Sequence, residues 1–332
     1  MTKSSSEPPR RLGEFAMIAK FFAPLSADAE GAFGLADDVA TLQVPDGQEL
    51  VAKVDAIIEG VHFLRTDPAG LIAKKALRVN LSDLAAKGAV PVGYLLSLSI
   101  APWCDDAWLA SFAAGLGEDQ ARFRLSLLGG DTTATPGPLT LSVTALGSIP
   151  KGRTVRRAGA VPGDCVFVTG TIGDAGAGLA VLKGEGALLT AYERDDLIGR
   201  YRLPEPRLSL GQLLPALASA SLDVSDGLVA DLGHIAEVSH VRVVIEAARV
   251  PLSRPCAKLW GGDAILRAIT AGDDYEVAFT APASARARIA EAAEKSGVPV
   301  HEIGRVEEGE GIVLLDVKGQ PISVARPGYT HF

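Results

Sequence analysis

Apolar residues in the first 150 positions recur with two different periods, one typical of helices and one typical of strands. In residues 13–25, Phe15, Ile18 and Phe22 fall on one stripe of a helix. Residues 68–89 begin with proline and carry Gly88 near their end, which is the usual punctuation of a helix. The expected helices are 13–25, 68–89 and 105–123, and the expected strands are 34–44, 48–58, 93–102, 124–131 and 138–150. The turn PDGQ between the first two strands predicts a hairpin.

The second half shows the same alternation after a basic connector, KGRTVRRAGAVPGD. Strands are expected at 165–170 and 241–252, and helices at 173–187, 208–219 and 284–297; the tail carries GIVLLDVKG. Residues 221–239 are expected to form a loop entering a helix, and residues 268–282 to end one element and start a strand.

This alternation predicts an α+β protein (strands and helices alternating) with two mixed α/β domains, at 11–150 and 151–332. The Ser- and Pro-rich residues 1–10 are expected to be a disordered tail. A faint similarity between LLGGDTT and ITAGDDYE suggests that the two halves are related.

Composition narrows the possible partners. The 332 residues are 48% apolar and 22% charged, as in a well-buried globular protein. The net charge is −8 and no Lys/Arg-rich block occurs, so nucleic acid is not an expected partner. No apolar segment is long enough to span a membrane, and MTKSSSEPPR lacks an apolar signal core. The three isolated cysteines fit a reducing cytoplasm, which is the expected location.

Aspartates gather at the ends of apolar runs, mostly beside glycine, and no nucleophile–base pair accompanies them. They are Asp37, Asp38, Asp55, Asp83, Asp131, Asp223, Asp226 and Asp273. Two carboxylates about 4 Å apart repel by roughly 4 kcal/mol at an effective dielectric near 20, unless a cation intervenes. Oxygen-only ligands select hard ions such as Mg²⁺, which bridge carboxylates and phosphates. The pattern therefore predicts a magnesium-dependent phosphate enzyme.

Each aspartate also has a plainer interpretation. Asp37–Asp38 read alone as a turn, and Asp131 as a turn after a strand. Asp83 could lie on a solvated helix face with Asn80 and Lys87. Asp55 interrupts the apolar sequence LVAKVDAII, where a lone buried carboxylate would be costly.

The sequence DVSDG joins Asp223, Ser225 and Asp226 just before a predicted helix. Asp226 could be only an N-cap, yet two carboxylates, a hydroxyl and free helix-end N–H groups would also make a metal–phosphate cradle. The glycine-rich turn in VTGTIGDAGAGLA (168–180) either presents N–H groups to phosphate or packs a helix tightly. No GxxxxGK[ST] motif is present.

Two further side chains are candidates for anion contacts. Arg157 in TVRRAGA is the best candidate to neutralise a nucleotide phosphate. His62 is either a structural histidine or faces a substrate anion.

Five segments, in this order and spacing, are highly specific for one protein family. They are NLSDLAAKGAVP, LLGGDTT, VTGTIGDAGAGLA, DVSDGLVADLGH and GDDYE. The chain resembles the thiamine-monophosphate kinase family, which belongs to the ATP-binding superfamily of aminoimidazole ribonucleotide synthetase and selenophosphate synthetase. The resemblance runs from GEF at 13–15 to GYTHF at 328–332. It implies direct in-line phosphorylation of thiamine monophosphate by ATP, giving thiamine diphosphate and ADP, with several Mg²⁺ ions.

The resemblance also implies where each function lies. The N-terminal domain would bind ATP and Mg²⁺ and form a sheet or barrel at a homodimer interface, and the C-terminal domain would be an α/β sandwich. Asp131, Asp226 and Arg157 would be catalytic. The implied metal ligands are Asp38, Asp55, Asp83, Asp131, Asp223 and Asp226. The implied ATP contacts are Gly130, Asp131, Arg157 and Ser225, and the implied contacts of the thiamine phosphate are His62, Asp273 and Tyr329.

Three positions depart from the family pattern. Lys53 stands where a small hydroxyl residue is usual, Asp273 where Glu is common, and Ala36 where glycine is usual. An ammonium at Lys53 could replace one metal ion or contact phosphate directly. The alternatives are another ATP-dependent synthetase of the superfamily and a non-catalytic nucleotide-binding regulator.

Overall fold

The structure is a computed structural model that describes residues 12–324 and 326–329. It divides into two compact units. The N-terminal unit holds the described residues up to Asn80 together with Pro91–Ser148, and the C-terminal unit holds Leu81–Val90 and the described residues from Ile149 onward. The segment Leu81–Val90 thus belongs to the C-terminal unit, a division that the expected domains 11–150 and 151–332 did not include. The expected tail, 1–10, lies outside the described residues.

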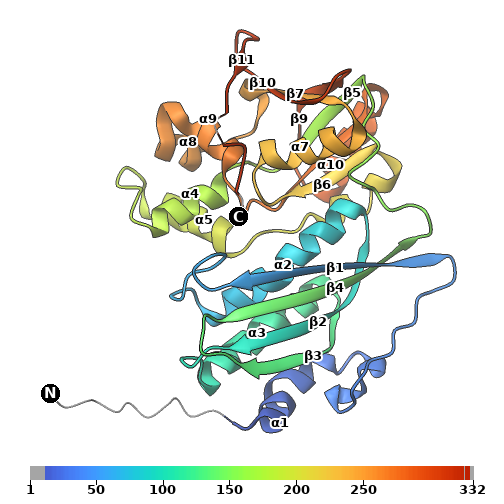
Figure 1. Cartoon of the computed structure of the whole chain (residues 1–332), viewed down its shortest axis with the longest axis vertical. Helices are drawn as coiled ribbons and strands as arrows, with labels where there is room; N and C mark the ends of the chain where they lie inside the picture. Colours follow the sequence, from blue (N-terminus) through green and yellow to red (C-terminus); the bar gives the residue numbers. More distant parts are fainter. Residues whose placement is uncertain (1–11, 325, 330–332) are drawn as a thin grey trace. The chain divides into compact units, whose positions relative to one another are not determined.

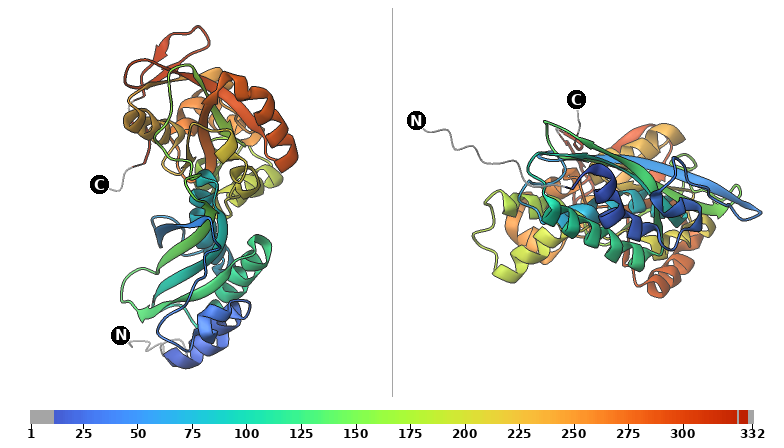
Figure 2. Two further views of the ribbon diagram at one scale, coloured as in Figure 1. Left: turned by 90° about the vertical axis from the view of Figure 1, so that its right-hand side faces the viewer. Right: turned by 90° about the horizontal axis from the view of Figure 1, so that it is seen from below.

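The N-terminal unit is a four-stranded sheet in the order β1-β4-β2-β3. Its strands are β1 (Gln48–Ile58), β2 (Val90–Ile100), β3 (Ser126–Ala134) and β4 (Thr140–Pro150). The helices α2 (Ala69–Lys87) and α3 (Asp106–Phe123) cover one face of this sheet (Figure 1). Figure 2 shows from the side that they lie on one side of the strands.

The predicted caps of both helices are present. The Asp105 side chain accepts a hydrogen bond from the N–H of Trp108 at the start of α3. Gly88 follows α2 with a φ of 81°, and a Cβ there would lie 2.5 Å from the ring of Pro215. Only glycine fits that position.

The first part of the chain is less regular than its pattern predicts. The expected helix 13–25 is helical but broken into α1 (Glu14–Met17), a π-helical stretch (Ile18–Phe22) and a 3-10 turn (Ala23–Ser26). The expected strand 34–44 is wrong, since residues 36–47 form neither helix nor strand in the described structure. Phe33 and Leu35 adopt left-handed φ values of 49° and 58°, which turn the chain away from an extended path.

The C-terminal unit is built on a seven-stranded mixed sheet in the order β11-β10-β7-β9-β5-β8-β6. Its strands are β5 (Asp164–Thr169), β6 (Ala220–Val224), β7 (Arg242–Glu246), β8 (Glu276–Pro282), β9 (Val300–Glu307), β10 (Gly311–Leu315) and β11 (Pro321–Ile322). Its helices are α4 (Asp174–Leu182), α5 (Ala191–Arg202), α6 (Leu208–Gly211), α7 (Leu228–Ser239), α8 (Arg254–Trp260), α9 (Ala264–Thr270) and α10 (Arg286–Ser296).

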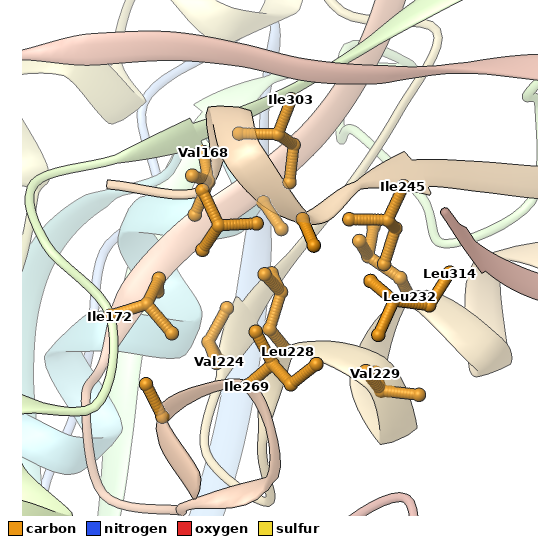
Figure 3. Close-up of a cluster of buried hydrophobic side chains, with 14 of the residues drawn as sticks. Val168, Ile172, Val224, Leu228, Val229, Leu232, Ile245, Ile269, Ile303 and Leu314 are labelled. Atoms are coloured by element: carbon orange, nitrogen blue, oxygen red, sulfur yellow. The ribbon is translucent and has the colours of Figure 1, made fainter. Parts of the chain in front are cut away.

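Alternation along the strands gives this sheet two buried faces. On β5, Val166 and Val168 face one apolar cluster, whereas Cys165 and Phe167 face another. Figure 3 shows the first cluster, where side chains of the sheet meet α7 and α9. The second cluster packs the sheet against α6, α10 and the end of α2. The predicted α+β fold with an α/β sandwich in the second half is therefore confirmed.

Several elements of this unit differ from the predictions. The expected helix 208–219 is only α6 and a 3-10 turn (Leu214–Ala216), because Pro215 interrupts it. The expected strand 241–252 stops at Glu246. The helices α5, α8 and α9 and the strands β9, β10 and β11 were not predicted. The expectation of a loop at the start of 221–239 is wrong, because residues 221–224 belong to the buried strand β6. No helix in the described part of the chain is long and apolar enough to cross a bilayer.

Candidate functional site

The N-terminal unit contains a cavity of about 670 Å³ beside β2 and β3. Asp37, Asp38, Gly130 and Asp131 line it, together with hydroxyl groups of β3 and β4 and many leucine side chains. The structure thus places an expected metal ligand, Asp38, and an expected metal and ATP residue, Asp131, on one cavity. Asp37 and Asp38 are exposed and lie in the irregular segment that replaces the expected strand.

Backbone packing explains why glycine precedes Asp131. The strands β2 and β3 run parallel, with Leu96 opposite Gly130 and Ser97 opposite Asp131. A Cβ on Gly130 would lie 1.9 Å from the carbonyl oxygen of Leu96. Asp131 was expected at the end of a strand, but β3 continues to Ala134. Asp131 therefore projects from within the strand, and it is exposed.

Asp55 lies on β1 and forms an ion pair with Lys53, whose Nζ is 3.1 Å from Oδ1. Residues two apart on a strand share a face, so both side chains project on the same side of the sheet. About a third of each side chain is exposed (29% for Lys53 and 36% for Asp55). Asp55 is therefore not the lone buried carboxylate that the apolar sequence suggested.

His62 lies in the turn after β1. Its Nδ1 accepts a hydrogen bond from the N–H of Ile58 at 3.1 Å, and its carbonyl accepts one from the buried Lys75 ammonium at 2.8 Å. An accepting Nδ1 carries no proton, so Nε2 is the N–H donor of the ring. Nδ1 thus has a structural role, and Nε2 carries the N–H group that can donate a hydrogen bond to an anion.

The C-terminal unit gathers the expected residues of the second half around the loop between β6 and α7. Asp223 is buried on β6, and Ser225 and Asp226 in the loop are partly exposed. The N–H of Asp273 donates to the carbonyl of Ser225 at 2.8 Å. The N–H of Tyr329 donates to the carbonyl of Asp226 at 2.9 Å. Three distant segments therefore meet at one loop.

Two glycines make this meeting possible. A Cβ on Gly272 would lie 2.6 Å from the carbonyl oxygen of Ser225, and one on Gly328 would lie 2.5 Å from that of Asp226. Asp273 itself has a left-handed φ of 70°, and its Oδ1 accepts a hydrogen bond from the Tyr275 hydroxyl at 3.3 Å. The loop that follows Gly272 is thus shaped to bring Asp273 against the β6–α7 loop.

The expected free helix-end N–H groups of the DVSDG cradle are not free. The N–H groups of Ser225, Asp226 and Gly227 all donate to Oδ2 of Asp231, at 3.0, 3.0 and 3.1 Å. Burial, and then the neighbouring Asp226 carboxylate, raise the pKa of Asp231 to about 7. Asp231 was not predicted from the sequence as a functional residue, although its place in the first helical turn after DVSDG was a signal for such a contact.

The glycine-rich turn before α4 is structural for a similar reason. The N–H groups of Gly173 and Ala175 donate to the carboxylate of Asp274 at 2.6 and 3.2 Å. Asp274 is buried, and burial raises its pKa well above the usual range. Gly173 has a φ of 88°, and a Cβ there would lie 2.4 Å from the Ala268 side chain. The plainer interpretation of this turn, tight helix packing, is the one that the structure favours.

Asp83 lies on the part of α2 that belongs to the C-terminal unit. The preceding Ser82 hydroxyl donates to the carbonyl of Tyr275 at 3.4 Å, and the Lys87 ammonium donates to the carbonyl of Ser221 at 2.5 Å. These bonds place the helical turn of Asp83 beside β6, near the loop that follows Val224. Asp83 is only partly exposed, so the polar stripe is not a solvated face.

Arg157 lies in the connector that runs along the edge of β6. The carbonyl of Arg156 accepts the N–H of Ser221 at 2.9 Å, and the carbonyl of Arg157 accepts the Ser239 hydroxyl at 3.4 Å. The backbone is thus held by β6 and α7, and Arg157 is exposed.

The expected metal ligands are therefore divided. Asp38, Asp55 and Asp131 belong to the N-terminal unit, and Asp83, Asp223 and Asp226 belong to the C-terminal unit. Among the residues that the structure describes, no group of three or more His, Cys, Asp or Glu side chains forms a metal site. Of the eight aspartates, Asp223 is the one that is buried, and the other seven are partly or largely exposed.

Comparison with known proteins agrees with this two-unit arrangement. The family model described as "AIR synthase related protein, N-terminal domain" matches residues 36–149, and the one described as "AIR synthase related protein, C-terminal domain" matches residues 161–317. The chain is thus a two-domain AIR synthase-related protein.

Relatives define the family more narrowly. Thiamine-monophosphate kinase of Caulobacter vibrioides is 42% identical over 325 residues, which cover 96% of this chain and 90% of the relative. The crystal structure of thiamine-monophosphate kinase from Stenotrophomonas maltophilia K279a is 39% identical, with a TM-score of 0.83 over 94% of this chain and 98% of that one. A structure described as AaThiL complexed with AMPPCP and TMP is 32% identical, with a TM-score of 0.76 over 97% of this chain and 99% of that one. The chain belongs to the thiamine-monophosphate kinase family.

Proposed function

We propose that this protein is an ATP-dependent phosphotransferase that converts thiamine monophosphate into thiamine diphosphate and releases ADP. The observation that supports it best is the convergence of Asp223, Asp226, Asp273 and Tyr329 on one loop of a chain that belongs to this family. The related structure that holds AMPPCP and TMP supports ATP and thiamine monophosphate as the two substrates.

The polar groups match the needs of direct phosphoryl transfer. Such a transfer requires alignment of two phosphates and neutralisation of their charge, with little covalent chemistry from the protein. This agrees with the chemistry of the proposed residues, which are carboxylates, one arginine and one histidine. Arg157, on a backbone held by β6 and α7, neutralises nucleotide phosphate. Nε2–H of His62 donates to the phosphate of the acceptor.

Several Mg²⁺ ions fit the carboxylates. The donors are all oxygens, which suits a hard cation. Burial is the main cause of the raised pKa of Asp231, and repulsion by the Asp226 carboxylate adds to it; a cation beside Asp226 would relieve this second contribution. Asp38, Asp55 and Asp131 of one unit and Asp83, Asp223 and Asp226 of the other would hold the ions. Ions held by these carboxylates would supply positive charge that neutralises the charge developing on the phosphates during transfer.

The remaining roles follow the same chemistry. Gly130 allows the close strand packing that exposes Asp131 to the nucleotide, and Ser225 offers a hydroxyl beside Asp226. Asp273 and the Tyr329 ring suit a cationic heterocycle through charge and ring-face attraction. We further propose a homodimer formed through the N-terminal unit and a cytoplasmic location.

The test is a product assay with the purified full chain. ATP, Mg²⁺ and thiamine monophosphate should give thiamine diphosphate and ADP in equal amounts, and unphosphorylated thiamine should not be an acceptor. Tight ATP binding without thiamine diphosphate would instead indicate a nucleotide-binding regulator. Light scattering after size-exclusion chromatography measures the oligomeric state, and a mass near 34.4 kDa would contradict the dimer.

A further inference from the structure

One side chain holds the β6–α7 loop from within and has none of the roles proposed above. Asp231 lies in the first turn of α7, and its Oδ2 accepts the N–H groups of Ser225, Asp226 and Gly227 at 3.0, 3.0 and 3.1 Å. The N–H of Asp231 also donates to the carbonyl of Gly227 at 2.9 Å. Asp231 therefore closes the loop and the first helical turn into one hydrogen-bonded unit.

The carbonyl side of the same loop is held by the segments that supply the expected substrate contacts. Asp273 donates its N–H to the carbonyl of Ser225, and Tyr329 donates its N–H to the carbonyl of Asp226. With the N–H groups bound to Asp231 and two carbonyls bound to these segments, the loop backbone is fixed on both sides. Its side chains at Ser225 and Asp226 remain partly exposed.

Burial limits what Asp231 itself can do. Its exposure is 2%, so contact with a substrate is ruled out in this conformation. An anion at a helix N-terminus normally binds the unpaired N–H groups there. The N–H groups of Ser225, Asp226 and Gly227, just before α7, are already bound to an internal carboxylate, so this loop can meet a ligand anion through its side chains or through cations that they hold.

We propose that Asp231 is a positioning residue, an internal anion that fixes the direction in which Ser225 and Asp226 project toward the nucleotide and its cations. The inference deepens the proposed function and rests on it. A merely structural cap would stabilise the helix by about 1 kcal/mol and leave the folded enzyme unchanged. A positioning residue changes turnover in the folded enzyme, because a displacement near 1 Å can cost about 100-fold in rate.

The experiment compares Asp231→Asn and Asp231→Ala with a matched carboxylate-to-amide change, Glu237→Gln. Glu237 lies on the same helix, and its side chain is 79% exposed. Steady-state kinetics are measured with thiamine monophosphate, and amide hydrogen exchange is measured over residues 223–231 in the protein alone. Asp231→Asn should lower kcat about 10-fold and Asp231→Ala about 100-fold, with KM for thiamine monophosphate within about twofold of wild type. Exchange should increase at 225–227, and Glu237→Gln should change neither quantity.

Two results would overturn the inference. The first is an Asp231→Asn protein with wild-type kcat and wild-type exchange in the loop. The second is a loss of kcat that matches the unfolded fraction in either variant, since that indicates stability alone. If Asp231→Ala does not fold, the kcat and the hydrogen exchange of Asp231→Asn decide whether the inference holds. If the wild type makes no thiamine diphosphate, the proposed function fails, and the exchange data still decide whether Asp231 holds the loop.

Discussion

Lys53→Ser tests whether an ammonium group takes part in the metal site of this protein. Lys53 Nζ lies 3.1 Å from Oδ1 of Asp55, one of the proposed Mg²⁺ ligands. A cation that binds Asp55 must therefore compete with a charge that is already in place. Removing that charge should make divalent cations bind more tightly.

The expected size follows from the geometry of the pair. Two unit charges 3.1 Å apart attract by about 1.3 kcal/mol in water and about 5 kcal/mol at an effective dielectric near 20. The Lys53 and Asp55 side chains are 29% and 36% exposed. Solvent screening at that exposure reduces the value of such a pair to about 1 kcal/mol. This corresponds to about a fivefold change in the dissociation constant of the ion.

The assay is direct binding of Mn²⁺, measured from the signal of the free ion, beside the Mg²⁺ dependence of the rate. Lys74→Ser is the matched control, because Lys74 is an ion-paired lysine of the same unit whose partner is Glu118. Lys53→Ser should bind Mn²⁺ about fivefold more tightly or bind one more ion per chain. Equal affinity and stoichiometry in wild type, Lys53→Ser and Lys74→Ser would place Lys53 outside the metal site.

Substitutions at three further positions test the site and the contacts that support it. Asp226→Asn should depress kcat strongly while the urea midpoint stays within error of wild type, and near-normal turnover would refute a metal-binding role. Arg78→Met should lower the free energy of unfolding by about 3–5 kcal/mol, because it leaves the buried Asp119 without its bidentate partner; a loss below about 1 kcal/mol in urea titrations would contradict this. Asp274→Ala should cost about 1–3 kcal/mol by leaving two buried N–H groups unbonded. Asp274→Asn should gain stability relative to wild type as pH rises from about 4, because the raised pKa of Asp274 makes its contribution disappear with increasing pH. A pH-independent difference in urea titrations between Asp274→Asn and wild type would refute that assignment.

The sequence predicted helices and strands best where the period of the apolar residues agreed with the residue types at the ends of the element. Residues 68–89 had proline before the helix and glycine after it, and α2 spans Ala69–Lys87. The sheet of the N-terminal unit was likewise predicted except for the strand 34–44. That segment alternates suitably, but backbone reversals at Phe33 and Leu35 cannot be read from an apolar pattern.

The missed elements have physical reasons as well. The helix α5 is polar on most positions, and its beginning is fixed by a capping box between Thr190 and Glu193 rather than by an apolar stripe. The helices α8 and α9 have only seven residues each, too few to show a period. The 208–219 pattern was helical, but Pro215 ended it.

The aspartates show why the candidate site was only partly predictable. Asp226 and Asp231 both follow an apolar strand and both stand near glycine, yet one is partly exposed and the other is 2% exposed. The difference is the position in the helix. An acid within the first turn can reach back to the N–H groups before it, whereas an acid ahead of the helix projects from the loop.

Asp273 and Asp274 lie side by side in the loop between α9 and β8, yet Asp273 is partly exposed and Asp274 is buried. The carboxylate oxygens of Asp231 and Asp274 each accept hydrogen bonds from backbone N–H groups near the start of a helix, so these oxygens are bonded within the protein itself. Asp226 and Asp273 stand directly beside these two residues in space or in sequence and keep their carboxylates partly exposed. Buried acids therefore shape the two loops, and their partly exposed neighbours are the ones left to meet cations. If this division is correct, changes at Asp231 and Asp274 alter loop exchange and stability first, whereas changes at Asp226 and Asp273 alter metal and substrate binding first.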